Sequence, residues 1–250
     1  MKSKKELLDI IKGQLSIEYN CSVNDFSLSD NIVTTQKNSP QRRQYFDGTF
    51  FFQMVTFGDN VIISADECIH EWLNEYVKDK KGHWIFEHNN LLKIEQKLNE
   101  YNKNLSQTHH MFLSFKGIIQ KDIDVKIKWF ENENIHQFYD LKMFPNAIAK
   151  KHNPKRPDVL AVAAYNGNDI IAMAGCSADT PLLWQIGVDV NEKFSGKGIG
   201  TYLVTLLKNE IENRGKIPFY GTSLSNLYSW GVALNSGFSP VWIEISSIEN

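Results

Sequence analysis

The sequence predicts an α/β protein of the α+β kind, with a mixed, mostly antiparallel sheet flanked by helices and preceded by a smaller α/β lobe. Three observations predict this class. Two apolar runs flank an Asn-Gly-Asn turn at 166–168, which is typical of a hairpin. Residues 181–214 follow the pattern of a strand, a glycine loop and an amphipathic helix. Residues 218–223 then form a strand after a helical crossover, so we expect it to be parallel to the strand before the helix.

Composition narrows the class of protein. The 250 residues are 42% hydrophobic, and 27 basic residues against 29 acidic ones give a net charge of -2, without the basic excess of a nucleic-acid-binding protein. Cys21, Cys68 and Cys176 are far apart and form no C-x-x-C pair, which favours a reduced, cytoplasmic protein without a thiolate zinc site. The charged, amphipathic N-terminus is unlike a signal peptide, and no apolar run has the length of a membrane span.

Two domains are expected, an N-terminal α/β lobe at 1–121 and a second domain at 122–250. In the first lobe, the periodicity predicts a helix at 3–19, irregular chain with weak strands at 27–43, and strands at 49–57 and 61–64. A helix capped by Ser64 or Asp66 is expected to run through residue 76. It is followed by a strand at 82–87, a helix from Asn89 or Asn90, and a strand at 109–115. His109 and His110 suggest a metal site, but adjacent strand residues point to opposite faces and no further ligands have suitable spacing. No metal site is therefore expected.

The second domain has a regular order of expected elements. They are a strand at 124–130, a helix at 132–143, a basic loop at 150–157, a hairpin of strands at 159–165 and 170–178, a strand at 182–190, a helix from about 198 to 214, a strand at 218–223, a helix at 226–236 and a strand at 238–246. Gly215 and Gly237 follow the two long helices, where a left-handed residue commonly ends a helix. The order predicts one compact domain.

The loop before the long helix is rich in glycine. It has the sequence Ser195-Gly196-Lys197-Gly198-Ile199-Gly200 and ends at a helix N-terminus, where unpaired N–H groups favour an anion. The spacing fits neither the Walker phosphate loop nor the dinucleotide fingerprint, because Gly198 follows Lys197 and residue 201 is threonine. The interpretations left are a phosphate-binding loop of another kind and a β–α turn without a ligand.

This loop, after a strand that ends in Gly-Val-Asp-Val, resembles the acetyl-CoA-binding motif Q/R-x-x-G-x-G/A of the GNAT (GCN5-related N-acetyltransferase) family. Ser195, Gly198 and Gly200 occupy its fixed positions, and the spacing of Asn226 from Gly237-Phe238 is similar to that of a later family motif. The resemblance covers roughly residues 158–245. By analogy of length and order alone, the first lobe is similar to the degenerate GNAT-like lobe of some bacterial members.

The resemblance implies an N-acetyltransferase that uses acetyl-CoA as acyl donor and moves the acetyl group to a primary amine by direct attack in a ternary complex. It implies that backbone groups of Val188 and Val190 bind the pantetheine arm and the thioester, where an N–H would stabilise the oxyanion. The cofactor-binding residues that it implies are Val188, Asp189, Val190, Ser195, Gly196, Lys197, Gly198, Ile199, Gly200, Thr201 and Asn226. For Asn226, a helix N-cap is the alternative role.

The chain departs from the family pattern at three positions. Ser195 stands where the family usually has Arg or Gln, so pyrophosphate binding would rest on backbone N–H groups, with Lys197 adding charge. Ala233 stands where many members have the tyrosine that is taken to protonate the CoA thiolate. Gln185 follows Trp184 near a position where some members have a glutamate base. The sequence therefore leaves the general acid and the general base unassigned.

Several side chains are weighed for these roles. Asp189 and Glu244 are the catalytic candidates and Asp179 is a further possible base, although each of the three carboxylates is more often a solvated or capping group. Trp184 and Trp242 could line an acceptor pocket, but core packing is the more common role of such residues. The basic loop 150–156 could bind an acidic acceptor or the CoA 3′-phosphate, or could simply be solvated. Cys176 is expected to be a buried thiol rather than a nucleophile.

Three alternatives to acetyl transfer stay open. The donor could be another acyl-CoA, because the loop reads the phosphates and the pantetheine rather than the acyl group. The protein could bind acyl-CoA without catalysis, as a regulatory protein with the GNAT fold, or be a structural protein that binds no CoA. The expected partner is a small-molecule or peptide amine, with no nucleic acid and no membrane. The oligomeric state is open, and a homodimer that pairs the final strand is one arrangement that suits this fold.

Overall fold

The computed structural model describes residues 2–45, 48–115, 117, 123–139 and 143–249. The chain divides into two compact units. Unit 1 contains the described residues of 43–45 and 112–240, and unit 2 contains those of 2–42, 46–111 and 241–250. The predicted domain boundary between residues 121 and 122 lies outside the described residues and stays a prediction.

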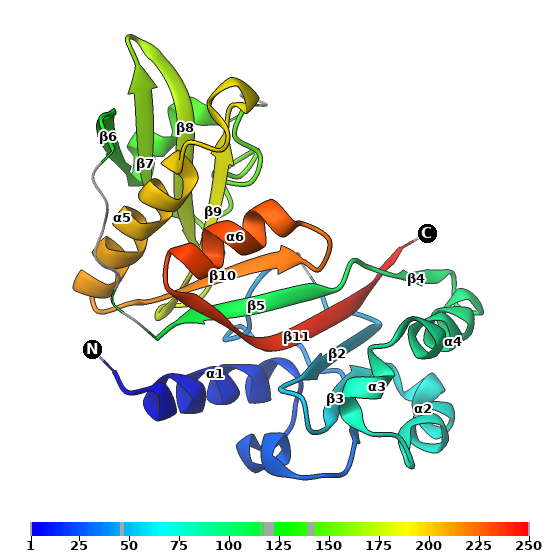
Figure 1. Ribbon diagram of the computed structural model, residues 1–250. Coiled ribbons are helices and arrows are strands. Elements are labelled where there is room, and N and C mark those ends of the chain that lie inside the picture. The colour runs from blue at the N-terminus through cyan, green and yellow to red at the C-terminus, as the bar shows by residue number, and fades with distance from the viewer. Residues whose placement is uncertain (1, 46–47, 116, 118–122, 140–142, 250) are drawn as a thin grey trace. The chain divides into compact units, whose positions relative to one another are not determined.

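Unit 1 is built on a sheet with the strand order β6-β7-β8-β9-β10 (Figure 1). Neighbouring strands are antiparallel except β9 and β10, which are parallel. The strands are β6 (Lys126–Glu131), β7 (Asp158–Asn166), β8 (Asp169–Ala178), β9 (Leu183–Val190) and β10 (Ile217–Ser223), and the helices are η3 (Asn132–Phe138), η4 (Glu192–Phe194), α5 (Ile199–Asn213) and α6 (Leu227–Asn235). The predicted mixed, mostly antiparallel sheet flanked by helices is confirmed, as are the hairpin and the parallel return.

Both faces of this sheet are covered. The side chains of β7 alternate, so Val162 and Ala164 pack in the core beside α5, whereas Ala161 and Ala163 pack with η3 and the turn at 144–148. On the helical face, the buried Lys208 of α5 donates a hydrogen bond of 2.9 Å to the carbonyl oxygen of Ser236, which follows α6. Burial lowers the pKa of the Lys208 ammonium, and this bond joins the two helices.

Unit 2 has a smaller sheet in which β2 pairs antiparallel with β3 and with part of β11, β1 is parallel to β3, and β4 pairs with the end of β11. Its core lies between β2, β3 and the helices α2 and α4. The elements are α1 (Lys4–Glu18), η1 (Val23–Ser27), β1 (Ile32–Thr35), β2 (Phe52–Thr56), β3 (Val61–Ala65), η2 (Glu67–Ile69), α2 (His70–Val77), α3 (Gly82–Ile85), α4 (His88–Asn99) and β4 (Lys103–Leu105). β5 (His109–Ser114) and β11 (Phe238–Glu249) contribute residues to both units.

One predicted element is wrong in type, and another is a 3₁₀ helix whose described part is shorter than expected. The strand expected at 82–87 is the short helix α3. Gly82 is buried, and an added Cβ there would lie 2.5 Å from the carbonyl carbon of Asn60. Its N–H also donates to Asp59, so a tertiary contact overrides the local pattern. The helix expected at 132–143 is the 3₁₀ helix η3 at Asn132–Phe138, whose spacing of three buries Ile135 and Phe138, and residues 140–142 lie outside the described residues.

The other predicted elements lie close to their expected positions. Asp66 rather than Ser64 accepts a hydrogen bond from a following backbone N–H, that of Cys68, and α4 begins one residue before Asn89. Cys176 is buried in β8, and this burial raises the pKa of its thiol well above the ordinary value. Among the described helices, none combines the length and apolar character that a membrane crossing requires.

Candidate functional site

The turn between β9 and α5 requires glycine at two positions. Gly196 has φ 75° and Gly198 has φ 79°, both in the left-handed region that other residues adopt at a cost. Gly198 is the N-cap of α5, and residues 195–198 are exposed. Gly200 has a packing role instead, because an added Cβ would lie 3.2 Å from Val190 Cγ2. The turn therefore holds α5 close to β9 and leaves its own backbone open to solvent.

The N-terminus of α5 carries backbone donors to which no side chain is bonded. Within the described part of the chain, no side chain accepts a hydrogen bond from the first turn, and the first helical bond runs from Tyr202 N–H to Gly198. Lys193, before the turn, and Lys197, within it, are both exposed, and Lys197 Nζ lies 5.1 Å from the ring centroid of Phe194. Donors of this kind, with cations beside them, are suited to bind an anion.

β9 separates from β10 before it reaches this turn. The two strands are paired from Leu183–Ile217 to Ile186–Tyr220, and no pairing with β10 continues along Gly187–Val190. β8 remains paired with β9 as far as Val190. The C-terminal half of β9 therefore has one bonded edge and one open edge, and in Figure 1 its end lies apart from β10. The GNAT resemblance implies that this strand separates from the strand at 218–223 and so opens a cleft for the pantetheine arm, and the structure has this separation.

Asp189 lies in the C-terminal half of β9 and forms hydrogen bonds with a turn that is distant in the sequence. Its Oδ2 accepts hydrogen bonds of 2.8 Å from the backbone N–H groups of both Asn146 and Ala147, and its Oδ1 accepts one of 2.6 Å from Asn146 Nδ2. Gly187 lies under the same turn, because an added Cβ would be 1.8 Å from Asn146 O. These contacts give Asp189 a structural role, and its catalytic role stays a prediction.

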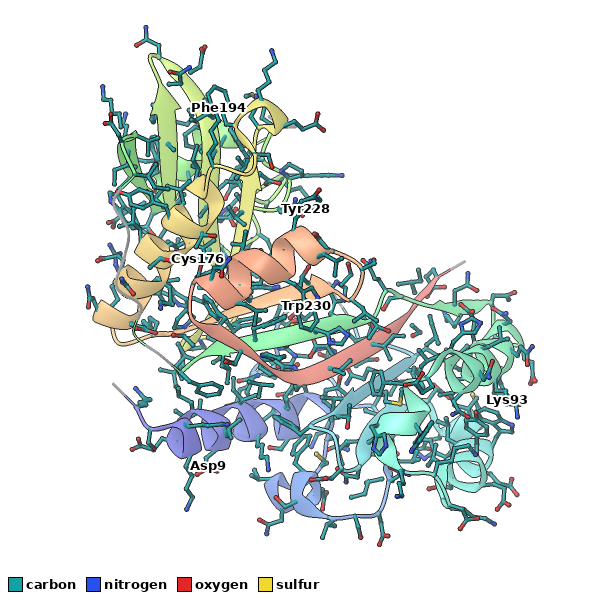
Figure 2. The ribbon with its side chains drawn as sticks, viewed as in Figure 1. Asp9, Lys93, Cys176, Phe194, Tyr228 and Trp230 are labelled. Carbon is teal, nitrogen blue, oxygen red and sulfur yellow. The ribbon has the colours of Figure 1, made fainter. Side chains whose placement is uncertain are left out.

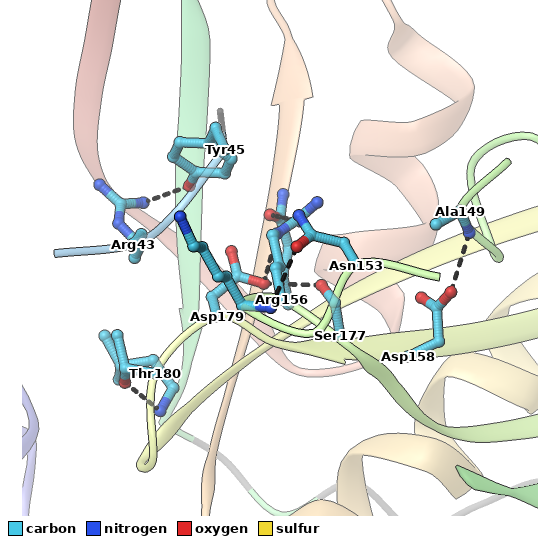
Figure 3. A network of polar contacts seen from close by, with 12 residues as sticks. Arg43, Tyr45, Ala149, Asn153, Arg156, Asp158, Ser177, Asp179 and Thr180 are labelled. Carbon is cyan, nitrogen blue, oxygen red and sulfur yellow. Dashed lines mark hydrogen bonds and ion pairs between the residues drawn. The ribbon is translucent and has the colours of Figure 1, made fainter. Parts of the chain in front are cut away.

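Asp179 is the centre of a buried polar network at the opposite end of β9 (Figure 3). Its Oδ1 lies 2.7 Å from Arg156 Nε and 2.6 Å from Ser177 Oγ. Arg156 also donates to Gln185 Oε1 at 2.7 Å, and its guanidinium carbon lies 5.1 Å from the Tyr45 ring centroid. Burial raises the pKa of the Asp179 carboxyl, and Arg156 offsets part of that rise. The network gives the one arginine of the predicted basic loop a structural partner.

The remaining predicted residues divide between core and cap positions. Glu244 accepts a hydrogen bond of 2.9 Å from Trp242 Nε1 and belongs to unit 2. Trp184 and Trp242 are both buried, so their predicted core packing is confirmed. Asn226 is the N-cap of α6, where its Oδ1 accepts from Ser229 N–H at 3.1 Å. Its proposed contact with pantetheine stays a prediction, as do the binding roles of Val188, Val190 and residues 195–201.

The sequence analysis missed a hydroxyl pair at the point where the strands separate. Tyr220, the last β10 residue paired with β9, has its hydroxyl 2.7 Å from Ser229 Oγ, in the first turn of α6. Ala233, where the family pattern has a tyrosine, is 0% exposed and packs in the core. No sequence spacing signals a contact between a strand and the helix after it, although both elements were predicted.

Comparison with known protein families gives a match over part of the chain. Residues 125–238 match the model of the acetyltransferase (GNAT) family. These residues form a GNAT domain. The match contains the β9–α5 turn, the strand separation and the Tyr220–Ser229 pair. Among curated proteins, none matches the chain in sequence.

Several solved structures are similar to the chain at low identity. A GNAT-family protein from Novosphingobium aromaticivorans is 14% identical, with 58% of this chain and 66% of that one covered and a TM-score of 0.46. A Drosophila protein is 11% identical, with 97% and 88% covered and a TM-score of 0.47. The protein yncA of Salmonella typhimurium, solved with its cofactor acetyl-CoA, is 13% identical, with 51% and 94% covered and a TM-score of 0.36.

Proposed function

We propose that the GNAT domain transfers an acetyl group from acetyl-CoA to a primary amine by direct attack in a ternary complex. The observation that carries the proposal is the separation of β9 from β10 after Ile186–Tyr220, which leaves an open strand edge leading to the α5 N-terminus. An extended amide-bearing arm can bond to an open strand edge, and a pyrophosphate can bond to the helix N-terminus at the end of that edge. Together they suit a nucleotide with a long amide arm.

The residues of the turn fit the phosphate end of acetyl-CoA. The first-turn N–H groups of α5, from Ile199 to Thr201, would bind the pyrophosphate, with Lys197 supplying charge. Ser195 is exposed and short, so the turn relies on its backbone rather than on an arginine at this position. Backbone groups of Val188 and Val190 on the open edge would bind the arm, and an N–H directed at the thioester oxygen would stabilise the oxyanion.

The amine must lose a proton to attack, and the described residues of β9 offer no unoccupied carboxylate for this step. Both oxygens of Asp189 accept hydrogen bonds, and Gln185 is bonded to Arg156. In this proposal, water takes the proton from the attacking nitrogen. The acceptor is a small-molecule or peptide amine.

A non-catalytic acyl-CoA-binding role is the second candidate. The hydrogen bonds that occupy Asp189 favour it, because they leave the described residues of β9 without an unoccupied carboxylate while the open edge and the turn are retained. Both candidates require acyl-CoA to bind at the turn, so binding alone does not separate them. Neither candidate specifies which acyl group the donor carries, because the β9–α5 turn would contact the pyrophosphate and the open edge of β9 would contact the pantetheine arm.

Release of CoA thiol separates the two candidates. The full chain is incubated with acetyl-CoA and a panel of small amines, amino acids, polyamines and peptides, with succinyl-CoA as a second donor. We expect at least one amine to raise thiol release well above the rate with acetyl-CoA alone. Binding of acetyl-CoA without release of CoA thiol for any amine would instead establish the non-catalytic candidate. Absence of acetyl-CoA binding would contradict both candidates.

A further inference from the structure

A buried hydroxyl pair lies where the two central strands part. Tyr220 is 3% exposed, and its hydroxyl is 2.7 Å from that of Ser229, which is half-buried in the first turn of α6. The Ile186–Tyr220 pair is the last between β9 and β10, so the open edge begins beside Tyr220. An arm that starts at the α5 turn and follows β9 from Val190 to Ile186 covers about 13 Å, at roughly 3.3 Å per residue. The arm would therefore end beside this pair.

The surroundings keep Tyr220 protonated and leave part of its bonding capacity unused. The ring packs among aromatic residues, with centroid distances of 6.4 Å to Phe112 and 6.0 Å to Phe238. Burial raises the pKa of the Tyr220 phenol, which therefore stays un-ionised at neutral pH. A hydroxyl donates one hydrogen bond and accepts two, and the bond to Ser229 is the one found for it among the described residues.

Ser229 is itself held in place. Its backbone N–H donates to Asn226 Oδ1 at 3.1 Å, so the cap of α6 fixes the serine that contacts the tyrosine. If Ser229 donates its proton to Tyr220, the phenol proton is left for another acceptor. The N-terminus of α6 also favours a negative charge developing nearby. The pair is thus arranged to donate a proton to an anion formed at the end of the open edge.

Thioester aminolysis forms such an anion. Attack by the amine makes a C–N bond, and collapse of the tetrahedral intermediate breaks the C–S bond and expels the CoA thiolate, which needs a proton. Ala233 has no group to supply one.

We propose that Tyr220, positioned by Ser229, donates its proton to the sulfur of CoA as the C–S bond breaks. The inference rests on the proposed function. The phenol O–H proton moves to sulfur, and the resulting phenolate accepts a hydrogen bond from Ser229. The phenol is restored when the phenolate takes up, through water, the proton that the attacking nitrogen loses, so the overall products are the amide and CoA thiol. Tyr220 is the catalytic residue and Ser229 is a positioning residue.

The first test measures the contact with sulfur by binding alone. Affinities of CoA and of desulfo-CoA, which lacks the sulfur, are measured by calorimetry for the wild type, Tyr220→Phe and Ser229→Ala. We expect the wild type to bind CoA about tenfold more tightly than desulfo-CoA, as a hydrogen bond to sulfur would give. The ratio should fall to near one in Tyr220→Phe and to an intermediate value in Ser229→Ala, because a purely structural role would weaken both ligands equally. An unchanged ratio in Tyr220→Phe overturns the proposal.

The second test is kinetic, with Tyr228→Phe as the matched control. Tyr228 is 89% exposed on the same helix, and Figure 2 shows it on the outer side of α6. With an amine acceptor found as above, Tyr220→Phe should lower kcat by about 100-fold with the KM for acetyl-CoA within about threefold, whereas Tyr228→Phe should match the wild type.

The outcomes also separate this proposal from the proposed function. If the wild type releases CoA and Tyr220→Phe does so equally fast, the role of Tyr220 is wrong and the acetyltransferase stands. If the wild type binds acetyl-CoA but releases no thiol with any amine, both are wrong.

Discussion

The two ends of β9 differ in what their polar groups are bonded to. At the start of the strand, Asp179 is bonded to Arg156 and Ser177, and Thr180 Oγ1 accepts from the N–H groups of Leu182 and Leu183. At the far end, the pairing with β10 has stopped, and no side chain among the described residues caps the first turn of α5. One end therefore uses its polar groups to stabilise the fold, while the other leaves backbone groups available to a ligand. Variants of the polar network at the first end should change stability, and variants of the glycine turn at the second end should change binding.

The largest expected effect on stability comes from Arg156→Met. It removes the cation that is ion-paired with the buried Asp179 carboxylate, which should cost about 3 kcal/mol in the free energy of unfolding and lower Tm by roughly 6–12 °C. Thermal unfolding measures the loss. Lys151→Met removes the same charge from an exposed position of the same loop, and should stay within about 0.5 kcal/mol of wild type. Loss of acetyl-CoA affinity in folded Arg156→Met would contradict the division between the two ends.

This loss should depend on pH. The folded-state pKa of Asp179 is raised, so folded protein holds the proton more tightly than unfolded protein, and this group favours folding more as the pH falls. Arg156 lowers this pKa, so its removal raises it further. Arg156→Met should therefore recover stability relative to wild type as the pH is lowered from 7 toward the ordinary value of an aspartate, near 3.8. A deficit that is independent of pH would show that Asp179 is not the cause.

A smaller effect on stability is expected from Asp189→Asn. This variant tests whether Asp189, near the far end of β9, is a structural carboxylate. The variant loses acceptor capacity for the turn at 146–147, so stability should fall by about 2 kcal/mol while kcat changes less than tenfold. Asn146→Ala loosens the same turn and keeps the carboxylate, so the two variants should behave alike. If Asp189→Asn alone lowers kcat by about 100-fold or more, Asp189 is the general base.

The sequence predicted the elements that depend on local signals. The Asn-Gly-Asn turn, the glycines after α5 and α6, and the Asn226 cap each act within a few residues, and the structure has all of them. The wrong prediction at 82–87 lies where a tertiary contact is made. Gly82, where a helix begins in place of the expected strand, lies against Asn60 with no room for a Cβ, and this contact is between residues 22 positions apart.

The candidate site shows the same limit. The glycine turn could be found from its spacing, and the strand separation followed from the family resemblance. The bonds of Asp189 to the turn at Asn146 cross 43 residues, and the Tyr220–Ser229 contact joins a strand to a helix. No periodicity in one sequence encodes such contacts. These contacts show that the Asp189 carboxylate is already hydrogen-bonded and that the Tyr220 hydroxyl lies where the strands separate.

The central claim is that the β9–α5 turn binds acetyl-CoA, and two glycines of the same helix test it most directly. Gly198 and Gly215 flank α5 with φ 79° and φ 75°, so glutamate at either position should carry a similar backbone cost. Acetyl-CoA at about 100 times its Kd should stabilise the wild type and Gly215→Glu by about 2.7 kcal/mol in thermal unfolding, and folded Gly198→Glu not at all. Equal stabilisation of both variants, or none in the wild type, would contradict the account.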